Sequence, residues 1–144
     1  MHYHFKIHKE ENGYWAECIE LKGCKTEADS IEELNTNMQV VLDLFLSEPA
    51  DSKMLFPEPE NIKISKNIVQ ITVSPKVAFA YNLRKQRIIH NLTQKQVSEQ
   101  LGLKNLYSYQ RLESAKTSNP ALSTLYKIKK VFPKFKVDDI IEVV

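Results

Sequence analysis

The chain has 144 residues, which suits one ordinary domain or two small ones, and its hydrophobic fraction of 42% is typical of a globular protein. No apolar run approaches the roughly 20 residues that a membrane-spanning helix needs, so no transmembrane helix is expected. Cys18 and Cys24 are too few and too widely spaced for a Cys-x-x-Cys metal or redox pair. Since the N-terminus is not a signal peptide, we expect a cytoplasmic protein with two reduced structural thiols.

Charge divides the chain into two parts. Residues 1–60 contain 5 Lys and Arg against 13 Asp and Glu, a net charge of −8, whereas residues 61–144 contain 15 basic and 5 acidic residues, a net charge of +10. This asymmetry indicates two modules with different partners, a basic molecule for the first and a polyanion for the second. We therefore expect two domains, residues 1–75 and 76–144.

The first part begins with strand patterns. From His2 to His8, polar residues alternate with hydrophobic ones, which predicts a strand with one buried face. Glu11–Gly13 contains Asn-Gly, which supplies the positive φ angles of a tight hairpin, so Tyr14–Ile19 is expected as the return strand. After a turn at Lys22-Gly23, a short third strand is expected near Cys24–Thr26.

A helix and a fourth strand follow. Ser30 and Glu33 have the spacing of a capping box, and the helix must stop before Pro49. The expected buried stripe at helical spacing consists of Ile31, Leu34, Met38, Val41 and Phe45. Alternation over Val69–Val73 predicts a strand that returns to the first sheet. The first part is thus predicted as a β-β-β-α-β unit, and the whole chain as α+β.

From Val77 onward the pattern is helical throughout. Thr93 is a good N-cap, Gly102 supplies the left-handed turn that ends the helix, and a further helix is expected over Leu106–Ser114. Asn119-Pro120 is expected to start the next helix. The predicted buried stripe of that last helix is Leu122, Leu125, Ile128 and Phe132. The apolar tail, 137–144, either forms a fifth helix or supplies a dimer contact.

This second part resembles the Cro/C1-type (XRE-like) helix-turn-helix family. The residues that carry the resemblance are Leu83, Arg87, Leu92-Thr93-Gln94, Val97, Gly102, Leu112-Glu113 and Pro120. The resemblance implies an all-α domain that binds double-stranded operator DNA, as a homodimer or higher homo-oligomer. It also implies that Arg87 and Glu113 form a partly buried structural ion pair rather than DNA contacts.

The DNA contacts are expected at the leading end of the second of the two short helices. Counting back from Leu112 puts Tyr109 on the core face and Tyr107 and Arg111 on the outer face. Arg111 is expected to pair with guanine, and Gln94 to hold a phosphate. The other expected DNA contacts are Lys104, Asn105, Leu106 and Tyr107 toward the bases, and Ser114, Lys116, Ser118 and Asn119 along the sugar-phosphate backbone.

Residues 3–73 resemble the HicB antitoxin family. The carriers are Tyr3, Gly13-Tyr14, Ala16, Leu21, Gly23-Cys24, Thr26, Ser30, Glu32-Glu33-Leu34, Asn37 and Pro57. The resemblance implies a partial RNase H-like domain that masks a HicA-like mRNA-cleaving toxin, while the C-terminal domain represses the shared operon. A ribonuclease that grips RNA must be basic, and a domain of charge −8 would attract it. The candidate toxin-binding residues are Glu17, Glu20, Glu27, Asp29, Glu32 and Glu33.

An enzyme is not expected. Active RNase H-like proteins gather several carboxylates around Mg²⁺, but the first strand offers only His2, His4, Lys6 and His8. The three histidines share one strand face and are expected to be solvated rather than to bind a metal, and no cofactor is expected. The alternative function is a stand-alone transcriptional regulator whose N-terminal domain binds a small molecule or another protein.

Overall fold

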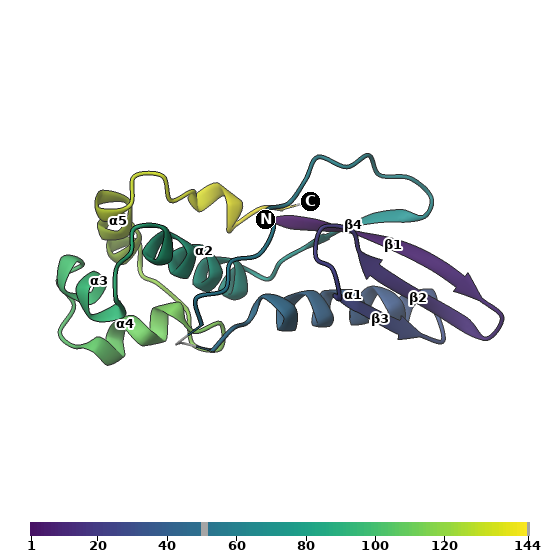
Figure 1. Cartoon of the computed structure of the whole chain (residues 1–144), viewed down its shortest axis with the longest axis horizontal. Coiled ribbons are helices and arrows are strands. Elements are labelled where there is room, and N and C mark those ends of the chain that lie inside the picture. Colours follow the sequence, from purple (N-terminus) through teal and green to yellow (C-terminus); the bar gives the residue numbers. More distant parts are fainter. Residues whose placement is uncertain (50–51, 144) are drawn as a thin grey trace. The chain divides into compact units, whose positions relative to one another are not determined.

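The computed structural model describes residues 1–49 and 52–143. Within these residues the chain is an α+β protein with one four-stranded antiparallel sheet and five α-helices (Figure 1). It forms two compact units. The first comprises Met1–Leu46, Phe56–Ser74 and Ile141–Val144, and the second comprises Ser47–Leu55 and Pro75–Ile140. No helix in the described part of the chain has the length and apolar character needed to cross a bilayer.

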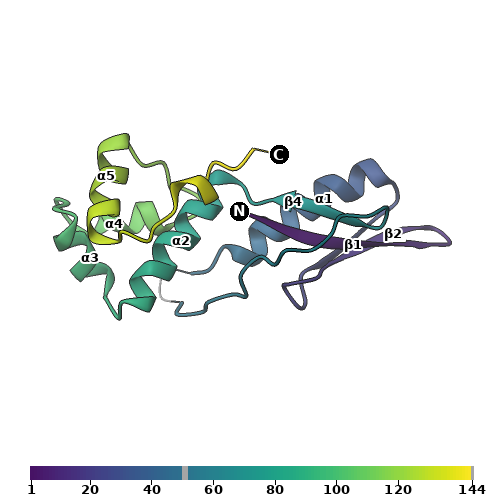
Figure 2. The ribbon, with the colours of Figure 1, turned by 90° about the horizontal axis from the view of Figure 1, so that it is seen from above.

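The first unit is the sheet with one helix. Its strands are β1 (His2–Glu10), β2 (Gly13–Cys18), β3 (Lys25–Ala28) and β4 (Ile68–Thr72), in the order β3-β2-β1-β4, and each neighbouring pair is antiparallel. Helix α1 (Ile31–Leu46) lies along one face of this sheet (Figure 2). The expected order of elements, including the return of the fourth strand to the first, is confirmed.

The hydrophobic core of this unit lies between α1 and the sheet. Phe5 pairs with Cys18 across β1 and β2, and both side chains are buried. The buried stripe of α1 is Leu34, Met38, Leu42 and Leu46. The predicted stripe was therefore wrong in part, because Ile31 is 38% exposed and Val41 and Phe45 are only half-buried. The helix carries hydrophobic residues on several sides, and the strict four-residue spacing is the one that meets the sheet.

The β1–β2 hairpin is tight and lies where the Asn-Gly pattern predicted it, but Asn12 has another backbone conformation. Glu10 pairs with Gly13, so the connecting loop is Glu11 and Asn12 alone. Asn91 is the one non-glycine residue with a positive φ among the described residues, so Asn12 does not use the predicted conformation. Gly13 is needed for another reason, since a Cβ atom there would lie 2.7 Å from the carbonyl oxygen of Ala28.

The face of the sheet opposite α1 is polar but partly covered. His4 was expected to be solvated, yet it is only 2% exposed. The Glu20 carboxylate accepts hydrogen bonds from His4 N–H (2.9 Å) and from His4 Nδ1 (2.8 Å). Glu60 N–H also donates to this carboxylate (3.2 Å), so the segment around Glu60 is fixed at this end of the sheet. The buried His4 is thereby satisfied by one buried carboxylate.

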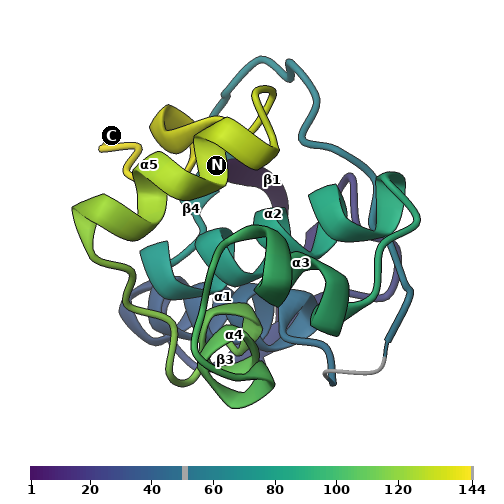
Figure 3. The same cartoon turned by 90° about the vertical axis from the view of Figure 1, so that its left-hand side faces the viewer.

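The second unit is a small bundle of helices (Figure 3). It contains α2 (Pro75–Ile89), α3 (Gln94–Gln100), α4 (Leu106–Glu113) and α5 (Leu122–Val131), followed by the 3-10 helix η1 (Val137–Asp139). Its core includes Phe79, Leu83, Val97, Leu101, Tyr109, Ile128, Phe132 and Phe135.

The start of α5 differs from the prediction. The N-cap is Ala121, which makes no side-chain cap, rather than Asn119 before Pro120. Because the helix begins two residues later than expected, Leu122 lies in its first turn and is 84% exposed, outside the buried stripe. After α5, the tail forms the short 3-10 helix η1, not the further α-helix that was one of its two expected roles. Val144 lies outside the described residues.

Candidate functional site

Helices α3 and α4 are short, and both begin at a side-chain cap. Thr93 Oγ1 accepts a hydrogen bond from Gln96 N–H (3.1 Å), and Gln96 Oε1 accepts one from Thr93 N–H (2.8 Å), which completes a capping box. Gly102, with φ of +68°, follows the end of α3. Asn105 Oδ1 accepts from Ser108 N–H (2.9 Å) and so starts α4. Gly102 and the Asn105 cap thus lie in the connection between the two helices, and the Thr93 capping box fixes the start of α3.

A buried polar network joins α2, α3 and α4. Arg87 donates from Nε to Glu113 Oε2 (2.9 Å) and from Nη2 to Glu113 Oε1 (2.7 Å), so the ion pair that the sequence predicted is present and bidentate. Tyr109 donates its hydroxyl hydrogen to the same carboxylate. Gln94 Nε2 donates to Glu113 Oε1 (3.3 Å), and Gln110 Nε2 donates to Gln94 Oε1 (3.2 Å).

The electrostatics of this network keep each group in a defined protonation state. Burial raises the pKa of Tyr109, and the charge of Glu113 raises it further, so the phenol stays a neutral donor. Burial opposes the charged form of Arg87, but the hydrogen bonds and charge of Glu113 outweigh it and raise the pKa of Arg87. The network therefore orients α4 against α2 through one cation, one anion and one neutral hydroxyl.

The outer side of α4 is exposed where the sequence placed its DNA contacts. Lys104 and Arg111 are exposed, and Tyr107 is 64% exposed. The Arg111 guanidinium lies 5.9 Å from the centre of the Tyr107 ring, so the two side chains share one surface. Leu106, at 39% exposed, begins the helix beside them.

Two of the predicted contacts are already engaged inside the protein. Asn105 Oδ1 accepts from both the N–H and the hydroxyl of Ser108, which leaves only its amide nitrogen for a base. A bidentate contact with adenine needs both amide atoms. Both amide atoms of Gln94 take part in the network with Glu113 and Gln110, so contact with a phosphate would require an exchange of partners.

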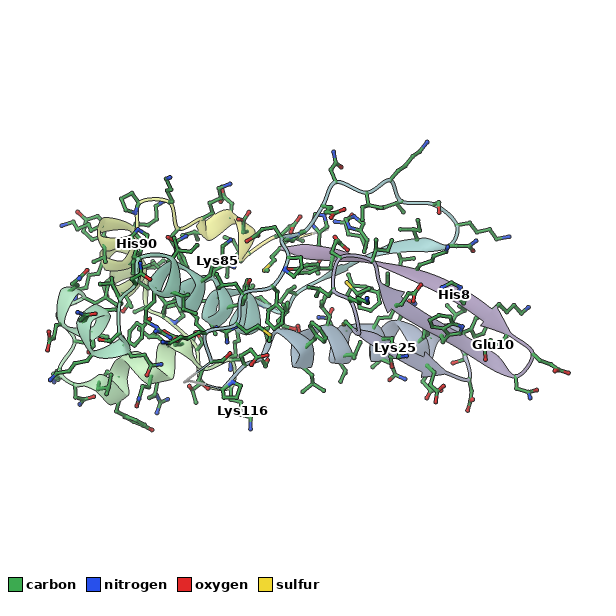
Figure 4. All side chains as sticks on the ribbon, viewed as in Figure 1. His8, Glu10, Lys25, Lys85, His90 and Lys116 are labelled. Atoms are coloured by element: carbon green, nitrogen blue, oxygen red, sulfur yellow. The ribbon has the colours of Figure 1, made fainter. Side chains whose placement is uncertain are left out.

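The segment after α4 divides into exposed and buried residues. Lys116 (labelled in Figure 4) and Asn119 are exposed, and Ser114 is half-buried. Ser118 was predicted to follow the DNA backbone, but it is 1% exposed, and its hydroxyl oxygen has no hydrogen-bond partner in the described part of the chain. This prediction is wrong, because a buried hydroxyl does not reach a phosphate.

A depression of about 530 Å³ adds two cations that the sequence did not indicate. Lys53 and Lys95, which are far apart in the sequence, both line it, together with Ser52, Arg87, Ile88, Asn91, Leu92, Thr93, Gln94 and Leu106. Lys53 belongs to the Pro-containing connector, which Arg84 helps to hold by donating from Nη2 to Met54 O (3.2 Å). Arg84 is itself only 3% exposed. Lys53 lies near α3 because of the tertiary fold, and nothing in the sequence around Lys53 predicts this position.

The predicted acidic contacts all lie on the first unit, and all but one of them are at least partly exposed. Glu17 is half-buried, and its Oε1 lies 3.3 Å from His8 Nε2. Glu20 is wrong as a surface contact, because its side chain is fully buried against His4. The exposed candidates are Glu27, Asp29, Glu32 and Glu33. A depression of about 570 Å³ is lined by Glu10, Glu11, Asn12, Gly13, Tyr14, Glu27, Ala28, Asp29 and Glu33.

The open face of the sheet also carries an aromatic site that the sequence did not single out. The His8 ring stacks on Trp15 at 4.0 Å between centroids. A depression of about 460 Å³ beside them is lined by Glu10, Trp15, Lys25, Thr26 and Glu27. His8, Glu10 and Lys25 extend from this sheet (Figure 4).

Residues 1–49 and 52–143 contain no group of three or more His, Cys, Asp or Glu side chains arranged to hold a metal ion. No protein-family model matches the chain, and no curated protein matches it.

Proposed function

We propose that the chain is a HicB-type antitoxin and transcriptional autorepressor without catalytic activity. Its helical unit would bind operator DNA as a Cro/C1-type helix-turn-helix domain, and its sheet unit would neutralise a basic, HicA-like mRNA-cleaving toxin. The observation that carries the DNA-binding half is the exposed cationic and aromatic side of α4, held by the buried ion pair of Arg87 and Glu113.

The arrangement of α3 and α4 supports a major-groove reader. A short helix whose N-terminus is fixed by a cap can present its outer side to base edges, while neighbouring cations contact the phosphates. Arg111, Tyr107 and Lys104 would supply the base-reading side chains, and Lys53 and Lys95 would supply phosphate contacts. One helical unit alone would make few contacts with DNA. The proposal therefore includes binding as a symmetric dimer to two half-sites.

The sheet unit supports a basic protein partner. Its exposed carboxylates Glu27, Asp29 and Glu33 surround one depression beside the β1–β2 hairpin and the start of α1. A ribonuclease surface that binds RNA is cationic, and complementary charge favours its capture by this face.

The first experiment is co-expression with the product of the neighbouring small basic gene, followed by co-purification through a tag on one partner. The proposal expects a stable complex and loss of growth when the antitoxin gene alone is deleted. Absence of such a neighbour, together with normal growth of the deletion strain, would exclude the antitoxin half.

The second experiment is Arg111→Ala with the operator upstream of the gene. A bidentate contact of arginine with guanine contributes about 1–3 kcal/mol, so we expect affinity to fall about 5- to 150-fold. Folding and toxin binding are expected to stay unchanged. Lys9→Ala, exposed on β1, is the matched control for loss of one positive charge. Unchanged operator affinity of Arg111→Ala would contradict the proposed reading face.

The second candidate function is a stand-alone regulator that senses a small molecule. The depression beside Trp15 and Lys25 favours it, since an aromatic floor with a cation and carboxylates suits a small polar ligand. Operator binding that responds to a metabolite extract, without a protein partner, would select this function.

A further inference from the structure

The two cysteines lie directly opposite each other at the end of the β2–β3 pairing. The register runs from Tyr14 with Ala28 to Glu17 with Lys25, so the next pair is Cys18 with Cys24. Cys18 N–H donates to the carbonyl oxygen of Cys24 (2.8 Å), which continues the ladder to this pair. Opposite residues on antiparallel strands have Cα atoms about 4.5–5.5 Å apart. Disulfides need about 4.4–6.8 Å, so the backbone geometry suits a cross-strand bond.

The thiols also face the same side of the sheet. Cys18 pairs with Phe5 on the α1 side, and Cys24 Sγ lies 3.9 Å from the carbonyl oxygen of Val41 in α1. The interaction with Cys24, together with burial, raises the pKa of Cys18, and the interaction with Cys18 lowers the pKa of Cys24. Cys24 is therefore the thiol that ionises first.

Both residues are free cysteines, and their exposed fractions are 5% for Cys18 and 1% for Cys24. Access to the thiols therefore depends on the loop that joins the two residues. This loop is a tight turn, in which Cys24 N–H donates to Leu21 O (3.0 Å) and Gly23 has a φ of +93°. Ile19, Lys22 and Gly23 are exposed. Short exposed loops open locally at low free-energy cost, which admits a small oxidant without unfolding the sheet.

We propose that Cys18 and Cys24 are a modification site, a dithiol that hydrogen peroxide converts reversibly into an intramolecular disulfide. The Cys24 thiolate attacks one peroxide oxygen, the O–O bond breaks, and the leaving hydroxide takes up a proton as water. The sulfur of Cys18 then attacks the resulting sulfenic acid at Cys24, the S–O bond breaks, and hydroxide leaves with the Cys18 proton as a second water. Two thiols and one peroxide thus give one disulfide and two waters.

The surrounding contacts allow the oxidised state to keep the fold. Oxidation removes the thiol contact from Cys18 Sγ to Glu20 Oε1 (3.8 Å). The Glu20 carboxylate keeps its hydrogen bonds from His4 N–H, His4 Nδ1 and Glu60 N–H. The new bond closes a loop between strands that are already paired, so no strand has to move to another register. This inference does not depend on the proposed function.

The test is oxidation of the folded, full-length protein with hydrogen peroxide, followed by denaturation, alkylation and intact-mass measurement. We expect a monomer that has lost two hydrogen atoms, takes up no alkylating agent and regains both thiols after dithiothreitol. Near-ultraviolet circular dichroism before denaturation reports whether the fold is kept. Two alkylated thiols after exposure that fully oxidises free dithiothreitol in a parallel tube would overturn the proposal, and so would a disulfide between two chains.

Single-cysteine variants test the order of the steps. With Cys18→Ser, a dimedone probe is expected to trap sulfenic acid on Cys24, because no second thiol resolves it. With Cys24→Ser, much weaker labelling of Cys18 is expected. Equal labelling of both variants would contradict the assignment of Cys24 as the attacking thiol, and the wild-type mass measurement remains decisive if either variant fails to fold.

Discussion

At the scale of single residues, Glu113 is the centre of the helical unit. Its carboxylate accepts hydrogen bonds from Arg87 on α2, Gln94 on α3 and Tyr109 on its own helix. Its side chain is 1% exposed. A charge this deeply buried is tolerated because all of its partners are in place, so removal of one member leaves the others unpaired.

We therefore expect Glu113→Ala to lower the free energy of unfolding of the helical unit by about 3–5 kcal/mol, because it strands the buried Arg87 cation. Urea unfolding followed by circular dichroism measures this. Glu99→Ala, an exposed position on α3, is the matched control and should change stability by less than about 0.5 kcal/mol. The double variant Arg87→Met with Glu113→Leu should recover part of the loss, because it removes the unpaired cation but leaves the Tyr109 hydroxyl without its acceptor. A Glu113→Ala effect no larger than the control would contradict this account.

Glu142 makes the stability of the sheet unit depend on pH. Its carboxylate accepts hydrogen bonds from the Met1 amine and lies beside the imidazole of His2. Burial alone would raise the pKa of Glu142, but the contacts with the amine and His2 outweigh it and lower the pKa. A depressed pKa in the folded state means that the stabilisation is present above the ordinary glutamate pKa of about 4.3 and is lost as pH falls through the folded value.

Glu142→Gln should accordingly be less stable than the wild type at pH 6, and the two should converge as the medium becomes more acidic than the folded pKa. Thermal unfolding measured across this range gives the difference at each pH. Asp138→Asn, at an exposed position, is the control for loss of one carboxylate. A stability difference that is constant with pH would show that the carboxylate charge is not the source.

At the scale of elements, the start of α4 combines a structural and a recognition role. Asn105→Ala removes the cap on Ser108 N–H and should destabilise the helical unit by about 1 kcal/mol. Asn105→Ser keeps a capping oxygen and should restore stability. Because only the amide nitrogen of Asn105 is free for DNA, we expect Asn105→Ser to bind the operator nearly as well as the wild type. A loss for Asn105→Ser as large as that for Arg111→Ala would instead assign Asn105 a dominant base contact.

The elements differ in how well the sequence predicts them, for physical reasons. The starts of α3 and α4 were predicted, the first from Thr93 as N-cap and the second at Leu106. Both depend on local information, since Thr93 and Asn105 accept hydrogen bonds from N–H groups three residues away. The buried face of α1 was only partly predicted, because Val40 and Leu44 are hydrophobic yet 51% and 68% exposed. Hydrophobicity alone does not choose among several apolar sides of one helix.

The candidate site shows the same division. The ion pair of Arg87 and Glu113 was expected from the family resemblance, and the exposure of Tyr107 and Arg111 was predicted from helical periodicity. The burial of Glu20 and Ser118 follows from contacts distant in sequence, and so does the placement of Lys53 beside α3. Composition gives the charge of a segment, but not which of its charges reach the surface.

At the scale of the whole molecule, the two halves of the chain carry opposite net charges, which supports the two different partners that we propose. For the sheet unit we predict that Glu27→Lys with Glu33→Lys slows association with the proposed basic toxin by at least 10-fold at low salt. Charges at the rim of an interface act mainly on the association rate, through long-range attraction that salt screens. The effect should therefore shrink as ionic strength rises, while the dissociation rate changes little. Surface plasmon resonance at several salt concentrations separates the two rates.

The matched control is Glu58→Lys with Glu60→Lys, which alters the net charge by the same amount at two exposed positions of the same unit. If the depression between the hairpin and α1 is the contact surface, the control variant should slow association much less than the variant within the depression. Equal slowing by both variants would mean that the toxin responds only to the overall charge of the unit. At about 0.15 M salt, the field of an exposed charge is screened over about 8 Å, so only charges close to the contact surface still affect association. The two outcomes are therefore best distinguished near this salt concentration.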